Sequence, residues 1–437
     1  MKAIMLTAPA SGSGKTTLTM GILRAIRKRG LEVCALKTGP DYIDRAFLEE
    51  ACKGKAGNLD MHLQGVEGLR SALAMADADY CVVEGAMGYF DGIYNTYINS
   101  SYDISRELEI NSVLVYTPKG EMFSAIPKIK GMTEFKDSRI KAVIFNNVSK
   151  KHYEMLKEAL EEYTGLMALG YMPRLETAGL KSRHLGLVQS VELEGIDAYI
   201  DELSEAVDKS IDLDGLLRLM SDIGAGSGIS IGRYDINVAI AKDKAFSFYY
   251  RENLALLEKT CNVTYFSPLE DEALPSCDLL YLGGGYPEVF KEELAKNKAM
   301  LDSIKGFSQG GGFIYAECGG FMYLTESIEG LSMVGVFEGQ SSLTDRLQNF
   351  GYVDIQIKAD CMLGNKGDRI TAHEFHKSVT KVKADTVLNI AKTMGDSQWE
   401  GGYQYKNTYG GYPHISFIGN MQVLENILDK VERSKKV

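Results

Sequence analysis

The chain has 437 residues, of which 45% are hydrophobic and 24% charged, so disordered and fibrous classes are excluded and two or three domains are expected. Its formal net charge of −11 argues against a surface that binds nucleic acid or an anionic membrane. Seven cysteines with no C-x-x-C pair favour a reducing compartment. Without a signal-peptide core or a long apolar segment, we expect a cytoplasmic protein that does not span a membrane.

The first half of the chain alternates short apolar runs with amphipathic segments. Apolar runs at 3–8, 31–37, 80–86, 111–117 and 141–147 predict strands, and residues 16–29 predict a helix. Continuous apolar runs separated by helices indicate parallel strands covered on both faces. The sequence therefore predicts a doubly wound parallel sheet of the α/β class.

A glycine- and serine-rich stretch at 211–233 predicts a linker. A second α/β series follows, with strands expected at 236–243, 261–267, 277–285 and 311–318, and shorter β-like pieces after residue 330. We therefore expect two domains, which comprise residues 1–222 and 234–437.

The segment between the first predicted strand and helix is typical of a phosphate-binding loop. It reads Ser11, Gly12, Ser13, Gly14, Lys15, Thr16 and Thr17. In such a loop backbone amides surround phosphate oxygens, the lysine reaches the β- and γ-phosphates, and the following hydroxyl can bind Mg²⁺. Pro9 stands where the strict pattern has glycine. The alternative is a glycine-rich turn with a surface lysine, but the position between strand and helix favours a nucleotide.

Acidic residues follow two other predicted strands. Glu84 ends one strand, with Asp91 in the next loop, and Lys37, Asp41 and Asp44 follow another strand. Carboxyl ends of parallel strands share one edge of the sheet, where ligands bind. The sequence therefore predicts a metal and nucleotide site there, although any one of these carboxylates could instead cap a helix.

Asn146 and Asn147 follow the strand predicted at 141–147. We expect Asn146 to belong, with Lys37, to the nucleotide site, where it would read a base edge. A pair of turn asparagines is an equally good interpretation.

Cys318 lies in the segment YAECGG, between a predicted strand and helix. This context predicts a nucleophile elbow, a tight turn that presents the thiol with a lowered pKa. The amides of Gly319 and of Gly284 and Gly285 in LGGGYPE would form the oxyanion hole. We interpret the other cysteines as small buried hydrophobic residues.

A thiol site also needs a base, and His414 in GGYPHISF is the candidate, since it follows a glycine turn and can fold back onto the elbow. His373 and His376 are an alternative base or a metal pair, with no third ligand apparent. His184 belongs to the first predicted domain, so its proximity to Cys318 cannot be assumed.

Together these motifs resemble the cobyrinic acid a,c-diamide synthase family of glutamine-dependent corrinoid amidases. The resemblance covers nearly the whole chain and is carried by KTGPDYID (37–44), NLD (58–60), VVEGAMGYFDG (82–92), SRHLGLV (182–188), AKDKAFSFYY (241–250), FSPLED (266–271), LGGGYPE (282–288), AECGG (316–320) and HEFH (373–376). It implies a dethiobiotin-synthetase-like domain that binds ATP, followed by a class I glutamine amidotransferase domain.

The resemblance also implies residue roles and substrates. ATP, Mg²⁺ and carboxylate activation would be served by Lys15, Thr16, Asp44, Glu84 and Asp91. Glutamine hydrolysis would be served by Cys318 and His414, and the loop near the substrate contains Tyr42 and Ile43. The substrates would be a tetrapyrrole carboxylic acid and L-glutamine, with amidation through acyl phosphates and ammonia passed between buried sites.

The chain departs from the family pattern at three places. Arg45 and Leu48 replace a proline and a histidine, which leaves the outline of the substrate pocket open, and Ser416 replaces the residue that could complete a triad with His414. Ni-sirohydrochlorin remains an alternative substrate. Two other activities stay open, a regulatory ATPase with an inactive amidotransferase domain and a ligase that takes ammonia directly. The oligomeric state also stays open, and a homodimer is compatible with the sequence.

Overall fold

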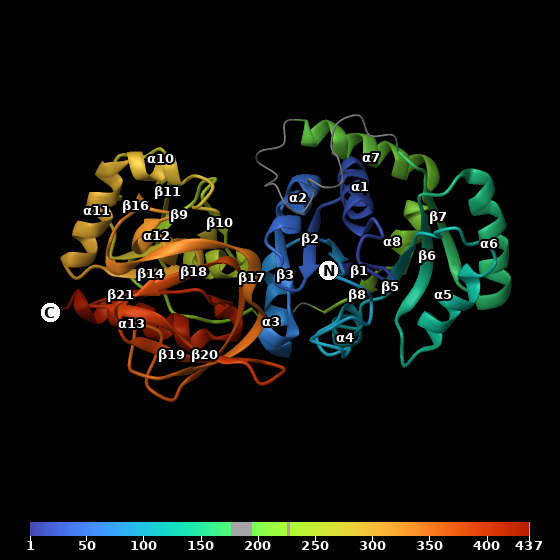
Figure 1. Cartoon of the computed structure of the whole chain (residues 1–437). Coiled ribbons are helices and arrows are strands. Elements are labelled where there is room, and N and C mark those ends of the chain that lie inside the picture. The colour runs from blue at the N-terminus through green and yellow to red at the C-terminus, as the bar shows by residue number, and fades with distance from the viewer. Residues whose placement is uncertain (176–194, 225–227, 437) are drawn as a thin grey trace. The chain divides into compact units, whose positions relative to one another are not determined.

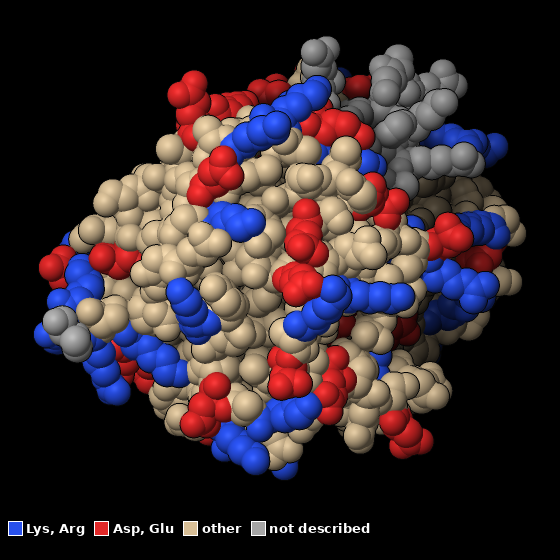
Figure 2. Space-filling model, turned by 60° about the vertical axis from the view of Figure 1, so that its left-hand side comes forward, with Lys and Arg blue, Asp and Glu red and all other residues tan. Residues whose placement is uncertain are grey.

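The structure is a computed structural model that describes residues 1–175, 195–224 and 228–436. The chain divides into two compact units, Met1–Gly228 and Ile229–Val437, and each is described by itself. None of the described helices is both long and apolar enough to cross a membrane. Figure 2 shows one face, on which acidic and basic side chains are interspersed among uncharged ones, as on an ordinary solvated surface.

The first unit is built on one sheet with the strand order β3-β2-β4-β1-β5-β6-β7 (Figure 1). Neighbours on this path are parallel, and β8 pairs antiparallel with β1. The strands are β1 (Lys2–Thr7), β2 (Val33–Thr38), β3 (Ala56–Leu59), β4 (Tyr80–Glu84), β5 (Ser112–Tyr116), β6 (Ile140–Asn146), β7 (Met167–Met172) and β8 (Ser221–Asp222). The parallel sheet and its five predicted strands are confirmed, whereas β3 and β7 were not predicted.

Helices connect the strands of this sheet. They are α1 (Lys15–Lys28), α2 (Ile43–Cys52), α3 (Met61–Ala76), α4 (Ser101–Glu107), α5 (Ala125–Glu134), α6 (Lys150–Thr164), α7 (Ile196–Ser210) and α8 (Leu213–Leu219). One hydrophobic core joins apolar side chains of α1, α2, α7 and α8 to strand residues such as Ile4 and Val82. Their burial against the sheet fixes the positions of the strand ends that carry the polar residues.

The linker predicted at 211–233 is wrong over its first part. Residues Leu213–Leu219 form α8, and Leu213 and Leu216 are fully buried in the core of the first unit. Asp212 caps this helix by accepting a hydrogen bond from the Gly215 amide at 2.8 Å. The regularly spaced leucines, and not the glycines beyond them, decide the local structure.

The second unit is a mixed sheet with the order β11-β9-β12-β14-β21-β20-β19-β17-β15-β16. Its strands are β9 (Asn237–Ala241), β10 (Phe246–Phe248), β11 (Asn262–Phe266), β12 (Leu279–Leu282), β13 (Gly284–Gly285), β14 (Phe313–Glu317), β15 (Thr325–Ile328), β16 (Leu331–Ser332), β17 (Phe337–Ile357), β18 (Arg369–Val382), β19 (Thr386–Lys392), β20 (Gln398–Tyr405), β21 (Thr408–Gly411) and β22 (His414–Ile415). The four predicted strands of this half correspond to β9, β11, β12 and β14 and are confirmed.

The helices of the second unit are α9 (Arg251–Thr260), α10 (Lys291–Lys296), α11 (Lys298–Gln309), α12 (Gly319–Leu324), the short 3₁₀ helix η2 (Phe417–Gly419) and α13 (Met421–Ser434). Strands β11, β9, β12, β14 and β21 are parallel. These helices and strands form a second α/β domain, as the sequence predicts.

The expectation of short strands after residue 330 is wrong for β17 and β18. These strands have 21 and 14 residues and pair antiparallel. Their register shifts between Leu343 and Gln348 and again between Gln348 and Gly351. Such irregularities interrupt the alternation of buried and exposed side chains, so one long strand has the sequence pattern of several short ones.

Candidate active sites

The loop between β1 and α1 has the backbone geometry of a phosphate-binding loop. Gly12 and Gly14 have φ values of 72° and 81°, which favour glycine. A Cβ on Gly14 would lie 2.3 Å from Asn146 Nδ2. Asn146 Nδ2 donates to the Ser13 carbonyl at 2.9 Å, and Thr117 Oγ1 donates to the same oxygen at 3.1 Å. Asn146 therefore braces the loop through its backbone.

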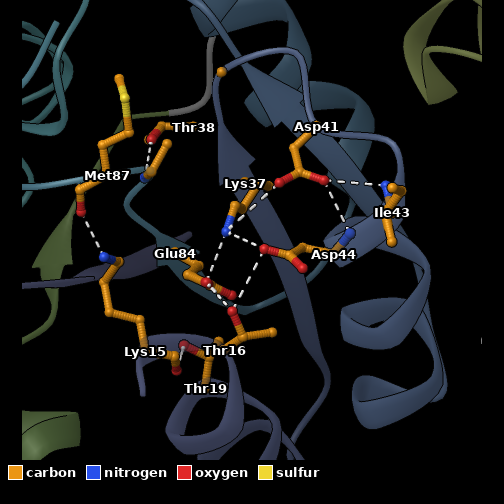
Figure 3. Close-up of polar contacts among 12 residues, drawn as sticks. Lys15, Thr16, Thr19, Lys37, Thr38, Asp41, Ile43, Asp44, Glu84 and Met87 are labelled. Carbon is orange, nitrogen blue, oxygen red and sulfur yellow. Dashed lines mark hydrogen bonds and ion pairs between the residues drawn. The ribbon is translucent and has the colours of Figure 1, made fainter. Parts of the chain in front are cut away.

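A buried ion cluster lies where β2 and β4 end (Figure 3). Lys37 Nζ donates to Asp44 Oδ2 at 2.8 Å and to Glu84 Oε1 at 2.7 Å. Thr16 Oγ1 donates to the same Glu84 oxygen at 2.6 Å. Lys37 is 4% exposed and Glu84 is fully buried. The structure thus brings together four of the residues that the sequence placed at this edge.

The charges of the cluster shift one another's pKa values. Burial alone would lower the pKa of Lys37, but the charges of Glu84, Asp44 and Asp41 outweigh it and raise the pKa. Burial alone would raise the pKa of Asp44, but the charge and the hydrogen bond of Lys37 outweigh burial and lower this pKa. Lys37 therefore remains an ammonium group that keeps Asp44 ionised.

Asp41 has a different task from Asp44. Its Oδ1 accepts hydrogen bonds from the amides of Ile43 and Asp44 at 3.0 and 2.9 Å, at the start of α2. Burial raises the pKa of Asp41 to about 6. Asp41 therefore caps two backbone amides at the start of α2. Tyr42, beside it, is largely buried, and Ile43 is the first residue of the helix.

The phosphate-loop lysine has a partner in the loop after β4. Lys15 Nζ donates to the Met87 carbonyl (Figure 3), and burial, followed by the charge of Lys37, lowers the Lys15 pKa to about 8. Asp91 Oδ2 accepts from the Gly88 amide at 2.9 Å, in the same loop. Asp91 is exposed and closes this loop, and no hydrogen bond is found between it and the Lys37 cluster among the described residues.

The donor set of this cluster fits Mg²⁺. Glu84 Oε2 is buried and makes no hydrogen bond to the described residues, so a carboxylate oxygen is left for a cation. Within the described ranges no group of three His, Cys, Asp or Glu residues could hold a metal ion by itself. Mg²⁺ does not need one, because it binds through one or two carboxylates and completes its shell with water and phosphate.

The second site is centred on Cys318, between β14 and α12. Its backbone has φ 48° and ψ −105°, a strained conformation for a non-glycine residue. A Cβ on Gly319 would lie 2.8 Å from Pro287 Cδ, and one on Gly320 would lie 2.3 Å from the Leu282 carbonyl. Only glycines allow this close approach, so the turn has the shape of a nucleophile elbow.

His414 lies in the same environment and is 1% exposed. A Cβ on Gly284 would lie 2.4 Å from His414 Cε1, while the Gly285 amide nitrogen would be 3.1 Å from a Cβ on Gly319. The Gly284–Gly285 segment therefore contacts both the histidine and the elbow. Burial, followed by the charge of His376, lowers the pKa of His414 to about 3.

The expected lowering of the Cys318 pKa is wrong. Burial raises it, and the nearby Glu288 carboxylate adds to the effect, while the Gly319 amide acts weakly in the opposite direction. Both Cys318 and His414 are therefore neutral in the resting protein. Nucleophilic attack by Cys318 would therefore require the thiol to lose its proton first.

Comparison with known proteins agrees with both sites. Residues 4–187 match the CobQ/CobB/MinD/ParA nucleotide binding domain, and residues 237–421 match the CobB/CobQ-like glutamine amidotransferase domain. Cobyrinate a,c-diamide synthases of Clostridium acetobutylicum and Clostridium tetani are each 42% identical over 98% of this chain and all of theirs. That of Streptococcus sanguinis is 40% identical over 99% of this chain and all of its own.

The chain belongs to the cobyrinate a,c-diamide synthase family. It is an amide-forming ligase that combines a nucleotide-binding domain with a glutamine amidotransferase domain. The resemblance seen in the sequence motifs is thereby confirmed.

In this family member the two histidines of HEFH do not form a metal pair. His376 Nδ1 donates to the Ser378 carbonyl at 2.8 Å, Nε2 lies 3.1 Å from Glu374 Oε2, and the ring stacks on Tyr412. His373 lies edge-on to Phe350 and Tyr352. His184 and the SRHLGLV motif lie outside the described residues.

Two features of the candidate sites were not predicted from the sequence. One is Glu317, whose Oε2 lies 3.8 Å from His414 Nδ1. Its position could have been noticed in the sequence, because Glu317 directly precedes Cys318 at the end of a predicted strand, where a carboxylate can act on a neighbouring nucleophile or base. The other is the contact between Lys15 and the Met87 carbonyl, which could not be predicted because every residue has a backbone carbonyl.

Two of the positions at which the chain departs from the family pattern lie in α2. Arg45 is buried and Leu48 belongs to the core, so Leu48 offers no polar group to the site.

Proposed function

We propose that this enzyme uses ATP and glutamine to amidate the a and c side-chain carboxylates of cobyrinate. One observation carries the proposal. A chain that matches cobyrinate a,c-diamide synthases along 98% of its length holds both a Lys37–Asp44–Glu84 cluster beside a phosphate loop and a Cys318 elbow beside His414. The first arrangement suits carboxylate activation and the second suits release of ammonia.

Activation is needed because a carboxylate has no leaving group that ammonia can displace. In the proposed step a carboxylate oxygen of the substrate bonds to the γ-phosphorus of ATP and ADP leaves. Ammonia then attacks the acyl phosphate and inorganic phosphate leaves, which gives the amide. Both steps place negative charge beside Lys15 and Lys37, the two ammonium groups at this strand edge.

In this scheme the amides of residues 11–17 surround the phosphates, and Asn146 keeps that loop in shape through Ser13. Lys15 exchanges the Met87 carbonyl for a phosphate oxygen. Thr16, Asp44 and Glu84 would hold Mg²⁺, which supplies charge neutralisation on the phosphates when bound. We assign to the substrate carboxylate Asp91, in the loop after β4, and Tyr42 and Ile43, at the start of α2.

The ammonia comes from glutamine. The Cys318 sulfur attacks the side-chain amide carbon, the oxyanion meets the amides of Gly284, Gly285 and Gly319, and the C–N bond breaks to release ammonia. His414 takes the thiol proton, gives it to the departing nitrogen, and then activates the water that hydrolyses the thioester. This shuttle requires a neutral resting histidine, and the lowered pKa of His414 supports that state.

Mass spectrometry of the products tests the proposal. The protein is incubated with ATP, Mg²⁺ and glutamine, and in separate reactions with cobyrinate and with Ni-sirohydrochlorin. We expect two amides on cobyrinate. Two amides on Ni-sirohydrochlorin alone would show that this compound, and not cobyrinate, is the substrate. ATP hydrolysis without any amide would favour a regulatory ATPase. Turnover with ammonia but never with glutamine would favour a ligase that uses ammonia directly.

A further inference from the structure

We propose that Glu317 is the positioning residue of His414, in place of an acidic residue that follows the histidine. Its carboxylate accepts the Nδ1–H of the imidazole, so that Nε2 is the unprotonated nitrogen that serves Cys318. This inference rests on the proposed glutamine hydrolysis and names the group that completes that site.

Glu317 is the last residue of β14 and is 1% exposed. Its Oε1 accepts hydrogen bonds from the Tyr315 hydroxyl and from the Ile415 amide, the latter at 3.0 Å, and its Oε2 accepts from the Tyr281 hydroxyl at 3.0 Å. Three donors hold the group in one orientation. Since a carboxylate offers about four acceptor positions, one remains on the side of His414.

The imidazole is oriented to use that position. Its Nδ1 lies 3.8 Å from Glu317 Oε2, while the Cε1–Nε2 edge lies against Gly284, in the segment that also contacts the elbow. A distance of 3.8 Å is longer than a hydrogen bond. Catalytic hydrogen bonds are often long in the free protein and shorten when substrate binds, and the proposal requires this contact to shorten in the same way.

The position used by other class I amidotransferases does not supply an acid. Ser416 follows His414 by two residues, and its hydroxyl is buried and makes no hydrogen bond to the described residues. Glu374 pairs with His376, whose Nε2 lies 3.1 Å from Glu374 Oε2, while Glu374 Oε1 is buried and makes no hydrogen bond to the described residues. Glu317 therefore stands where the chemistry needs a carboxylate, and it reaches His414 from a different strand.

The charge on Glu317 decides which nitrogen of His414 carries the proton. An ionised carboxylate accepts from Nδ1–H and leaves Nε2 as a base, whereas a protonated one donates to Nδ1 and leaves Nε2 protonated. Burial raises the pKa of Glu317 to about 7, although the Ile415 amide and the hydroxyls of Tyr315 and Tyr281 lower it. Glutaminase activity should therefore rise with pH through neutrality.

Other groups also face His414. His376 and His373 lie on β18, where His373 is the strand partner of His414, and the turn that follows Cys318 contacts the same Gly284–Gly285 segment as His414. Burial lowers the pKa of His373 to about 3 and raises that of Cys318. Neither group titrates near pH 7, and the Tyr281→Phe test below asks whether Glu317 carries a transition there.

The first test is Glu317→Gln, which preserves size and removes the charge. An amide that donates to Nδ1 selects the wrong tautomer, so the glutaminase kcat should fall by at least about 100-fold, with KM for glutamine unchanged. Amide synthesis from added ammonia should stay at the wild-type rate, because the phosphate loop is untouched. A folded Glu317→Gln protein with near wild-type glutaminase activity, or one that also fails with ammonia, would overturn the proposal.

The second test works even if Glu317→Gln fails to fold. Tyr281→Phe keeps the carboxylate and removes one donor to its ionised form, so the pKa of Glu317 rises and the pH midpoint of glutaminase activity should move up by about 0.5–1 unit. Tyr409→Phe is the matched control, since Tyr409 is buried nearby, stacks on Tyr315, and makes no hydrogen bond through its hydroxyl within the described residues.

A Tyr281→Phe profile that coincides with the Tyr409→Phe and wild-type profiles would contradict the role of Glu317. A different result would contradict the proposed function itself. It would be glutamine-dependent turnover that persists in the Cys318→Ala protein, independently of the results for the Glu317 and Tyr281 variants.

Discussion

The two sites handle charge in opposite ways. At the end of β2 and β4 an ammonium group and two carboxylates are already paired, with Lys37 between Asp44 and Glu84. Around Cys318, burial raises the pKa of the thiol and lowers that of His414, so both resting groups are neutral. In the proposed function, a charged ligand at the first site takes over ion partners that are already paired, whereas the second site becomes charged only when glutamine binds. Several experiments can break or sharpen this contrast.

Removing divalent cations should produce the largest difference between the sites. With a chelator present we expect no amide from either glutamine or ammonia, because phosphate charge is left unbalanced, and full recovery on addition of excess Mg²⁺. The rate at which a small alkylating reagent modifies Cys318, followed by peptide mass spectrometry, should stay unchanged. Amide synthesis that persists in chelator would remove Thr16, Asp44 and Glu84 from the metal site.

Substitution of Glu84 should affect both catalysis and stability. Glu84→Gln should lower amide synthesis from ammonia by about 100-fold or more, as expected for a lost metal ligand. It also removes a partner of buried Lys37, which costs about 3–5 kcal/mol of unfolding free energy. Asp44→Asn is the control, because Asp44 is 21% exposed and its loss should cost less. Denaturant titration would contradict the account if both variants were equally stable.

The neutral histidines of the second unit predict a pH effect on stability. The pKa of His373 is lowered to about 3, against an ordinary value near 6.5. The unfolded chain therefore binds this proton first as the pH falls, and stability is lost between about pH 6.5 and 3. His373→Phe has no imidazole to protonate in the unfolded chain. The difference in unfolding free energy between this variant and the wild type should therefore shift in favour of the variant by about 1.4 kcal/mol per pH unit below about 6.5. A difference that does not change with pH would contradict a buried neutral His373.

Asn146 offers the smallest effect. Asn146→Ala removes the hydrogen bond to the Ser13 carbonyl, which is worth about 1 kcal/mol, so the KM for ATP should rise about 5-fold with kcat little changed. Initial rates at varied ATP measure this. A large loss of kcat would instead assign Asn146 a direct part in phosphoryl transfer.

Much of the fold follows from local patterns. Apolar runs such as 111–117 and 141–147 are buried on both sides, so their strands are visible in the sequence, and parallel pairing then brings Lys37 and Glu84 to one edge. The strand β3 was not predicted because Ala56–Leu59 is short and has little apolar character. The length of β17 was not predicted because its register irregularities interrupt the alternation of buried and exposed side chains.

The details of the sites depend on contacts between distant parts of the chain. The sequence shows that Glu317 directly precedes Cys318, but not that its carboxylate lies 3.8 Å from His414 Nδ1. The sequence-based lowering of the Cys318 pKa failed because it considered the local helix and not the burial imposed by neighbouring strands. Residue types and strand order were predictable, whereas side-chain direction and desolvation came from tertiary packing.

The most direct test of two cooperating sites is a pair of single variants assayed with two nitrogen sources. Cys318→Ala should make no amide from glutamine but should retain near wild-type synthesis from concentrated ammonium salt at mildly alkaline pH, where free ammonia is available. Lys15→Ala should fail with both sources, because each requires activation of the carboxylate at the phosphate loop. Loss of both activities in a folded Cys318→Ala protein, or full glutamine-dependent synthesis without that thiol, would contradict the account.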